Sequence, residues 1–275
     1  MGLVVQGVEV YLVDRGSGEP ILFLHGVPNT AEMWSGVIAH LSTSHRCLAP
    51  DLPGFGRSIA PYSFDCSLEN RAGFINELVE AIGINVPLNL VVHDHGGPYG
   101  LAWAVKHPEK IRRIVIMNTL FQADYPWHIW ARIWRTPLVG ELSMAVLNWP
   151  LFLWELRRGS RKLSVEFIRD AYSKISPMMK RMVLRLYRAT DPDVFVGWED
   201  KLLTLTACIP TIVLWGDRDP YIAKHFAERF GAQTVQHFPT CGHWIANEAT
   251  DEVLQWLEEF LTTSRTHPVE RDRLV

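Results

Sequence analysis

Short apolar runs, each bounded by turn residues, recur along the chain and alternate with helical patterns. We expect strands at VEVYLV, ILFL, RCLAP, LNLVV, RIVIM, TIVLW and TVQHF (8–13, 21–24, 46–50, 88–92, 113–117, 211–215 and 234–238). Helical patterns lie between several of them, as in LENRAGFINELVEAIG and PYGLAWAVKHP (68–83 and 98–108). This alternation predicts an α/β fold with a mostly parallel central sheet flanked by helices, and functional groups at the carboxyl ends of its strands.

The strand pattern stops between residues 122 and 198, where the chain becomes aromatic and helix-like. WHIWARIW, SVEFIRDAYSKI and MMKRMVLRLYRA carry this character, and strand signals resume at Ile209. We expect an inserted helical cap at 122–198, on a core formed by 1–121 and 199–265. The polar end of the chain has no periodicity, so 266–275 is predicted to be a flexible tail.

Cysteine usage and the N-terminus indicate a cytoplasmic protein. The cysteines are scattered and form no C-x-x-C pair (Cys47, Cys66, Cys208 and Cys241). A chain of 275 residues can bury a full core without disulfides, so we interpret these residues as thiols of a reducing compartment. The N-terminus has no basic region before an apolar stretch, and no segment approaches the ~20 apolar residues of a membrane span.

The charge balance restricts the class of partner. Net charge is −3, with 27 basic and 30 acidic residues, which gives no basic field for nucleic acid. We expect a small apolar organic substrate and water as partners, with no nucleic acid and no membrane. A homodimer is compatible with the sequence.

The stretch VVHDHGGPYG (91–100) fits two chemistries. In the first, Asp94 is a nucleophile on a sharp turn between a strand and a helix, which Gly96 and Gly97 permit. In the second, His93 and His95 share one face of a strand and hold a metal. Further metal ligands are lacking, because the chain has no H-x-H-x-D-H and no H-E-x-x-H. The pattern favours the nucleophile, with no cofactor and no metal.

The remaining catalytic groups follow in the order nucleophile, acid, histidine. Asp219 comes after strand TIVLW in WGDRDP, and His243 lies in CGHW after strand TVQHF. A positioned carboxylate would fix the imidazole so that it takes a proton from water. Asp217 is the rival acid, because it lies closer to the end of the strand. Upstream, HGVP follows ILFL, so the amides of Val27 and His95 are the expected oxyanion donors.

These motifs resemble those of the α/β-hydrolase superfamily, and in particular of its epoxide hydrolase and haloalkane dehalogenase branch. HGVPNTAEMW, DLPGFGRS, VVHDHGGPYG, WGDRDP and CGHW carry the resemblance, in that order, over nearly the whole chain. Val92 departs from the small residue usual two positions before the nucleophile, and no G-x-S-x-G occurs. The resemblance implies the α/β-hydrolase fold and a two-step mechanism. Asp94 attacks a carbon to give an alkyl-enzyme ester, and water activated by His243 and Asp219 cleaves it.

Halide-binding positions distinguish the two members of this branch. Haloalkane dehalogenases bind the departing halide with a Trp directly after the nucleophile, together with a cap Trp or an Asn after the HG motif. His95 and Val27 occupy those positions here. Trp127 or Trp130 could still supply a cap donor, and dehalogenation therefore ranks second.

An epoxide hydrolase needs cap donors that protonate the ring oxygen. Tyr187, in VLRLYRATDP, resembles the second tyrosine of such a pair. His128, in YPWHIW, resembles the histidine of a His/Tyr variant, with Tyr125 as the alternative. Ordinary packing of amphipathic cap helices explains Tyr187 and His128 equally well. We expect Trp127, Trp130 and Tyr125 to contact an apolar substrate.

The sequence thus favours epoxide hydrolysis to a diol, with dehalogenation of haloalkanes as the alternative. An esterase acting through Asp94 ranks lower, because a carboxylate that attacks an ester gives a mixed anhydride. A metal-dependent hydrolase and a catalytically silent binding protein with the same fold also remain.

Overall fold

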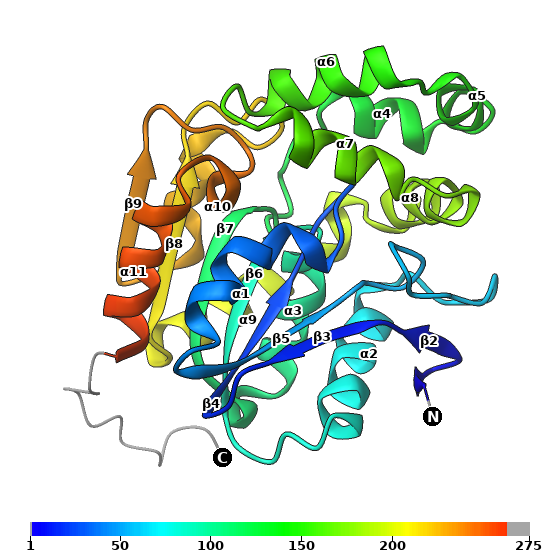
Figure 1. Ribbon diagram of the computed structural model, residues 1–275. Coiled ribbons are helices and arrows are strands. Elements are labelled where there is room, and N and C mark those ends of the chain that lie inside the picture. The colour runs from blue at the N-terminus through cyan, green and yellow to red at the C-terminus, as the bar shows by residue number, and fades with distance from the viewer. Residues whose placement is uncertain (1, 263–275) are drawn as a thin grey trace.

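A seven-stranded sheet forms the centre of the molecule, in a computed structural model that describes residues 2–262 (Figure 1). The predicted tail at 266–275 lies outside the described residues. The strand order is β3-β5-β4-β6-β7-β8-β9. The bounds are Leu12–Arg15 (β3), Glu19–Leu24 (β4), His45–Pro50 (β5), Leu88–Asp94 (β6), Ile111–Thr119 (β7), Thr211–Gly216 (β8) and Thr234–Phe238 (β9).

All neighbouring strands of this sheet are parallel except β3, which is antiparallel to β5. The predicted mostly parallel sheet is therefore confirmed. The single strand predicted over 8–13 was wrong, because this stretch contains β2 (Val8–Val10) and the beginning of β3, which belong to different sheets. A turn with positive φ at Gln6 and Gly7 folds β1 (Leu3–Val5) back onto β2, and this pair forms a separate sheet.

Helices cover both faces of the sheet and enclose two apolar cores. On one face α2 (Leu68–Ala81) contacts α3 (Gly96–Lys106), which contacts α9 (Trp198–Cys208). On the other face α1 (Ser35–Leu41) contacts α11 (Thr250–Thr262). The remaining short helices are η1 (Ala31–Trp34), η2 (Pro108–Lys110), η3 (Pro192–Phe195), η4 (Lys224–Phe230) and α10 (Ile245–Glu248).

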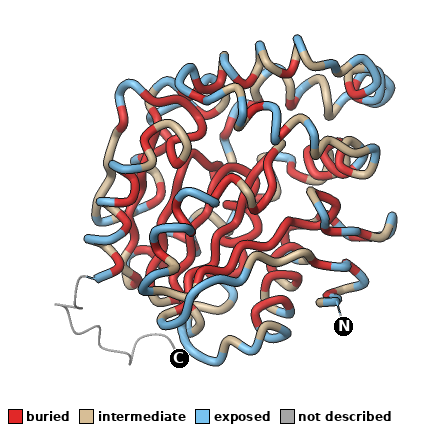
Figure 2. Tube along the Cα trace, in the orientation of Figure 1, coloured by how far each residue is buried: buried red, intermediate tan, exposed pale blue. Residues whose placement is uncertain are grey.

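Strand β6 shows why the sequence predicted this centre well. Each of its seven residues is buried, and the segments at the centre of the molecule are red in Figure 2. Leu90 and Val92 belong to the core on one face, and Val91 belongs to the core on the other. A strand covered on both sides needs a continuous apolar run, which is what LNLVV supplies.

Five α-helices between β7 and α9 lie over one end of the sheet, at the top of Figure 1. We call the segment 122–198 the cap. Asn148, Ser164 and Ser176 cap α6, α7 and α8 by accepting a hydrogen bond from a backbone N–H in the first turn. The bounds are Ile129–Arg135 (α4), Val139–Val146 (α5), Trp149–Gly159 (α6), Val165–Ser173 (α7) and Pro177–Ala189 (α8).

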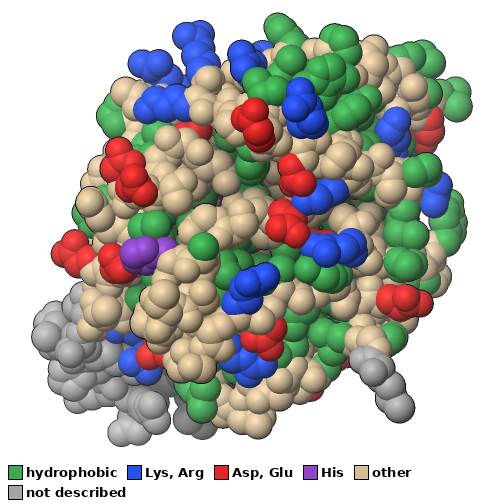
Figure 3. Space-filling view, in the orientation of Figure 1, with side chains coloured by type: hydrophobic (Ala, Val, Ile, Leu, Met, Phe, Trp, Pro, Cys, Tyr) green, Lys and Arg blue, Asp and Glu red, His purple; other side chains and the backbone are tan. Residues whose placement is uncertain are grey.

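The outer surface of the cap carries exposed apolar side chains, and hydrophobic residues gather at the upper right of Figure 3. Leu138, the N-cap residue of α5, and Leu142 and Val146 within α5 repeat at four-residue spacing and are exposed. Within residues 2–262 no helix is long and apolar enough to cross a membrane.

Candidate active site

The end of β6 holds Asp94 in a sharp turn with a φ of 47°. A residue other than glycine rarely adopts this conformation, and α3 begins two residues later. The surroundings leave no room for extra side-chain atoms. A Cβ atom on Gly26 would lie 2.2 Å from Asp94 Cβ, and one on Gly97 would lie 1.8 Å from the Thr119 hydroxyl. This is the geometry of a nucleophile elbow.

Val92 is accommodated although smaller residues are usual at its position. The reason lies on α3, where Gly100 faces the strand. A Cβ atom on Gly100 would approach Val92 Cγ1 to 2.6 Å. The missing side chain of Gly100 therefore compensates for the larger one of Val92.

Asp94, His243 and Asp219 come together at the carboxyl ends of the strands, and all three are buried. His243 Nε2 lies 3.5 Å from Asp94 Oδ2. His243 Nδ1 donates to Asp219 Oδ2 at 2.6 Å. The histidine thus bridges the two carboxylates, with one ring nitrogen directed at each.

Asp219 is fixed by donors on both of its oxygens. Asn118 Nδ2 donates to Oδ2 at 2.9 Å, while the N–H groups of Tyr221 and Ile222 donate to Oδ1 at 2.7 and 3.1 Å. Asn118 Oδ1 in turn accepts from the Gly216 N–H. Sequence reasoning missed Asn118. Its signal is a polar residue at the carboxyl end of the strand RIVIM, next to the strand that precedes Asp219.

The rival acid, Asp217, is engaged elsewhere. Its Oδ1 pairs with His237 Nδ1 at 2.5 Å, and His237 Nε2 pairs with Glu228 at 3.0 Å. Asp219 is therefore the carboxylate in contact with His243.

A backbone donor already points at the candidate nucleophile. The Val27 N–H donates to Asp94 Oδ1 at 2.7 Å. His95 is the N-cap residue of α3, so its amide lies at the positive end of a helix. The Val27 N–H is therefore placed to stabilise a negative oxygen formed on the Asp94 carboxyl group, and the His95 amide stays a predicted second donor.

The two histidines that flank Asp94 face different surroundings. His93 Nε2 donates to the carbonyl oxygen of His243 at 2.9 Å. The ring of His95 lies 4.5 Å from that of Tyr187, and neither of its nitrogens has a hydrogen-bond partner among residues 2–262. Burial lowers the pKa of His93 to about 3 and that of His95 to about 4. In the described part of the chain, no group of three His, Cys, Asp or Glu side chains is placed to hold a metal ion.

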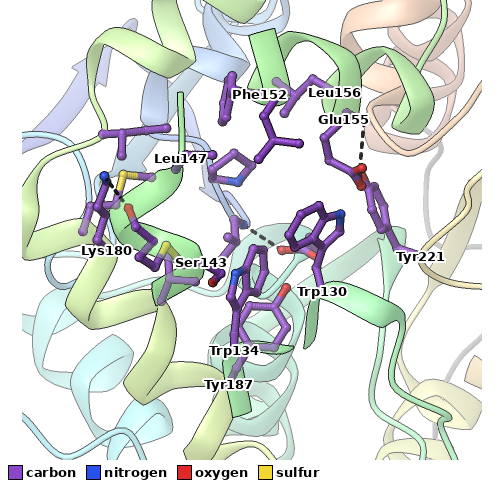
Figure 4. A pocket seen from close by; sticks show the side chains of 18 of the residues that line it. Trp130, Trp134, Ser143, Leu147, Phe152, Glu155, Leu156, Lys180, Tyr187 and Tyr221 are labelled. Atoms are coloured by element: carbon purple, nitrogen blue, oxygen red, sulfur yellow. Dashed lines mark hydrogen bonds between the residues drawn. The ribbon is translucent and has the colours of Figure 1, made fainter. Parts of the chain in front are cut away.

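A pocket lies between the cap and these residues (Figure 4). Six of the predicted site residues line it: Val27, Asp94, His128, Trp130, Tyr187 and His243. Trp127 and Tyr125 are not among the described residues that line it. The Tyr125 hydroxyl donates to the carbonyl of Tyr221, and the Trp127 ring packs between the rings of Tyr125 and Tyr187. The Trp127 ring thus contacts Tyr187, which does line the pocket.

The predicted cap donors, His128 and Tyr187, both line this pocket. Their ring centroids lie 5.9 Å apart. Burial lowers the pKa of His128 to about 4, so the ring is neutral at pH 7. Its Nδ1 accepts the Ala131 N–H at 3.3 Å, which leaves the proton on Nε2. Burial and the Asp94 charge raise the pKa of Tyr187 well above its ordinary value, so Tyr187 keeps its proton.

Charges within the triad are strongly coupled. Burial lowers the pKa of His243, but Asp219 and Asp94 outweigh it and raise that pKa to about 10. Burial raises the pKa of Asp94, but the interaction with His243 outweighs it, and the pKa lies below its ordinary value. At pH 7 a protonated His243 therefore lies between two carboxylates.

We expect Asp94→Asn to lower the pKa of His243 from about 10, because the amide removes one of the two negative charges that stabilise the imidazolium. Titration of the imidazole by NMR measures the shift. Asp217→Asn is the matched control, since Asp217 pairs with His237 and should leave the pKa of His243 unchanged. If both substitutions lowered the pKa of His243 equally, the charge interaction between Asp94 and His243 would be contradicted.

Comparison with known proteins agrees with this architecture. The family profile described as "alpha/beta hydrolase fold" matches residues 19–147. A cis-3-alkyl-4-alkyloxetan-2-one decarboxylase of Shewanella oneidensis is 29% identical, over 94% of this chain and 87% of that protein. Haloalkane dehalogenase 2 of Mycobacterium tuberculosis is 28% identical, over 89% of this chain and 88% of that protein.

A similar fold occurs in the Cif epoxide hydrolase from Acinetobacter nosocomialis, whose structure matches with a TM-score of 0.81 at 23% identity. The match covers 95% of this chain and 88% of that chain. The protein therefore has the α/β-hydrolase fold, and it is similar in sequence to haloalkane dehalogenases and oxetanone decarboxylases and similar in fold to an epoxide hydrolase.

Proposed function

We propose that the protein hydrolyses an epoxide to a diol through a covalent ester on Asp94. One observation carries the proposal, namely that Tyr187 and His128 line the same pocket as Asp94. The Tyr187 hydroxyl makes no hydrogen bond to another described residue, so it is free to bind a substrate oxygen. The pocket walls are mostly apolar, which suits a small apolar substrate.

In the first step an Asp94 oxygen attacks a ring carbon, and the carbon–oxygen bond of the epoxide breaks. Tyr187 and His128 donate to the oxygen as negative charge develops on it. Attack by a carboxylate needs no general base, since Asp94 is ionised. The products are an uncharged ester on Asp94 and a hydroxyl group, whose proton comes from the cap donors and is replaced by solvent.

Formation of the ester prepares His243 for the second step. An uncharged Asp94 no longer stabilises the imidazolium, so the pKa of His243 falls and the ring can act as a base. It takes a proton from water, whose oxygen attacks the ester carbonyl. The Val27 N–H stabilises the tetrahedral oxyanion on Asp94. Collapse releases the diol and restores the ionised Asp94 and the protonated His243.

We expect Tyr187→Phe to lower the rate of ester formation by about 10²-fold, at the low end of what a general acid contributes, because His128 remains as a second donor. Rapid-mixing measurement of the adduct on Asp94 gives this rate. Tyr125→Phe is the matched control, since it removes a cap hydroxyl that bonds the Tyr221 carbonyl outside the pocket. Equal rates for Tyr187→Phe and the parent enzyme would assign Tyr187 to packing.

Dehalogenation has less support from the site. The position after Asp94 is occupied by His95, whose ring lies against Tyr187 and is not among the described residues lining the pocket. Trp130 does line the pocket and is the remaining candidate for a halide donor.

Opening of a β-lactone is the second candidate, favoured by the similarity to oxetan-2-one decarboxylases over 94% of the chain. Asp94 would attack the saturated ring carbon that is bonded to the ring oxygen. The bond between these two atoms breaks, and the ring oxygen becomes part of a free carboxylate. Loss of CO₂ would then form the alkene and expel the Asp94 carboxylate, with no water consumed. This route uses the same nucleophile but gives an alkene instead of a diol.

Turnover of one panel separates these candidates. The purified protein is incubated with a terminal epoxide, a bromoalkane, a cis-disubstituted oxetan-2-one and a p-nitrophenyl ester, and products are identified by gas chromatography and mass spectrometry. Epoxide hydrolysis predicts a diol. An alkene with CO₂ from the lactone, or bromide release without diol formation, would replace the proposal with the corresponding alternative.

A further inference from the structure

We propose that the pocket binds the carboxylate of its substrate at Lys180, so that the substrate is an apolar chain with a reactive group in its middle and an anionic end. Of the described residues that line the pocket, Lys180 is the only lysine or arginine. This inference deepens the proposed function, on which it rests, by naming the class of substrate.

The Lys180 ammonium group has hydrogen-bond donors that no described residue uses. Its ammonium group donates to the Met144 carbonyl at 2.7 Å and makes no ion pair with a described Asp or Glu. An ammonium group has three donors, so two remain. The neighbouring lining residues include Ser143, Met144 and Met179, which leave the positive charge beside mostly apolar atoms. A carboxylate placed there would gain a charge-assisted hydrogen bond.

Neither acidic side chain that lines the pocket, Glu155 or Asp94, is paired with Lys180. Glu155 lies on the opposite side of the pocket from Lys180 in Figure 4. There it accepts from the Tyr221 hydroxyl at 2.9 Å and pairs with Arg158. Asp94 is paired with His243. Among the described lining residues, only Lys180 therefore offers an anionic group a positive charge that is not paired with a carboxylate, which fixes the direction of a chain-like ligand.

Helix α8 sets the distance between the two ends of such a ligand. Lys180, Val183 and Tyr187 follow the i, i+3, i+7 spacing of one helix face, and all three line the pocket. Seven residues advance a helix by about 10 Å, which an extended chain of about eight carbons spans. The reactive oxygen, held by Tyr187, should therefore lie about eight carbons from the carboxylate.

Binding of unreactive ligands tests this site without any chemistry. Decanoate and 1-decanol are titrated by calorimetry at pH 8 and constant ionic strength into the parent protein and the variants Lys180→Met, Lys180→Arg and Arg181→Met. We expect decanoate to bind the parent about tenfold more tightly than 1-decanol. Lys180→Met should abolish this preference without weakening 1-decanol, and Lys180→Arg should retain it.

Arg181→Met is the matched control, because it removes the same charge from an exposed neighbour on α8. Equal loss of decanoate affinity in Arg181→Met and Lys180→Met would mean a general electrostatic effect and overturn the proposal. Equal weakening of both ligands in Lys180→Met would mean that Lys180 only supports the end of α5, which overturns it too. Selective decanoate binding by a protein that opens no epoxide would support the anion site and reject the proposed reaction instead.

Discussion

Asp94→Ala should abolish turnover, with kcat lowered on the order of 10⁴-fold or more, as for removal of other covalent nucleophiles. Among the described residues, no other carboxylate near the pocket is available to replace it. Asp219 accepts three hydrogen bonds and pairs with His243, and Glu155 is paired with Arg158. Steady-state kinetics on the substrate identified in the panel measures the loss.

Folding of the Asp94→Ala protein is checked by circular dichroism and thermal unfolding. Asp217→Asn is the control for loss of an acidic residue near the triad, and it should keep most of the activity because Asp217 pairs with His237. A folded Asp94→Ala protein with kcat within about tenfold of the parent would exclude attack by Asp94.

His243→Gln should separate the two steps of the reaction. Ester formation continues, because Asp94 is ionised and the cap donors are intact, while water loses its base. Steady-state turnover should fall by about 10²–10⁴-fold, the usual contribution of a general base. A single burst of epoxide consumption, equal to the enzyme concentration or less, should precede the slow phase.

His237→Gln is the matched control, since His237 lies on β9 and pairs with Asp217 and Glu228 outside the pocket. The lactone route predicts a different result for His243→Gln, because elimination of the ester needs no water. Unimpaired release of alkene from an oxetan-2-one by this variant would favour that route.

The sequence predicted the parts of the molecule whose cause is local. β6 is covered on both faces, so its apolar run is visible in the sequence. The turn at Asp94 needs glycines close to it in the chain, and Gly96 and Gly97 are there. The contact of Asp219 with His243 follows from the order of the strands that carry them.

Other features depend on packing between distant segments. Asn118 acts on Asp219 only because β7 and β8 are neighbours, and Gly100 makes room for Val92 across a helix–strand contact. The cap shows the same limit. Amphipathic spacing cannot tell which side of a helix meets the pocket. It predicted contacts for Trp127 and Tyr125, which are not among the described residues that line the pocket, and gave no signal for Lys180, which does line it.

The covalent ester on Asp94 is the central claim, and the intact mass of the His243→Gln protein after mixing with epoxide tests it directly. We expect a mass increase equal to the whole epoxide, mapped by digestion to the peptide that contains Asp94, and absent from the double variant Asp94→Ala with His243→Gln. Turnover without any adduct, or an adduct on another residue, would contradict the mechanism.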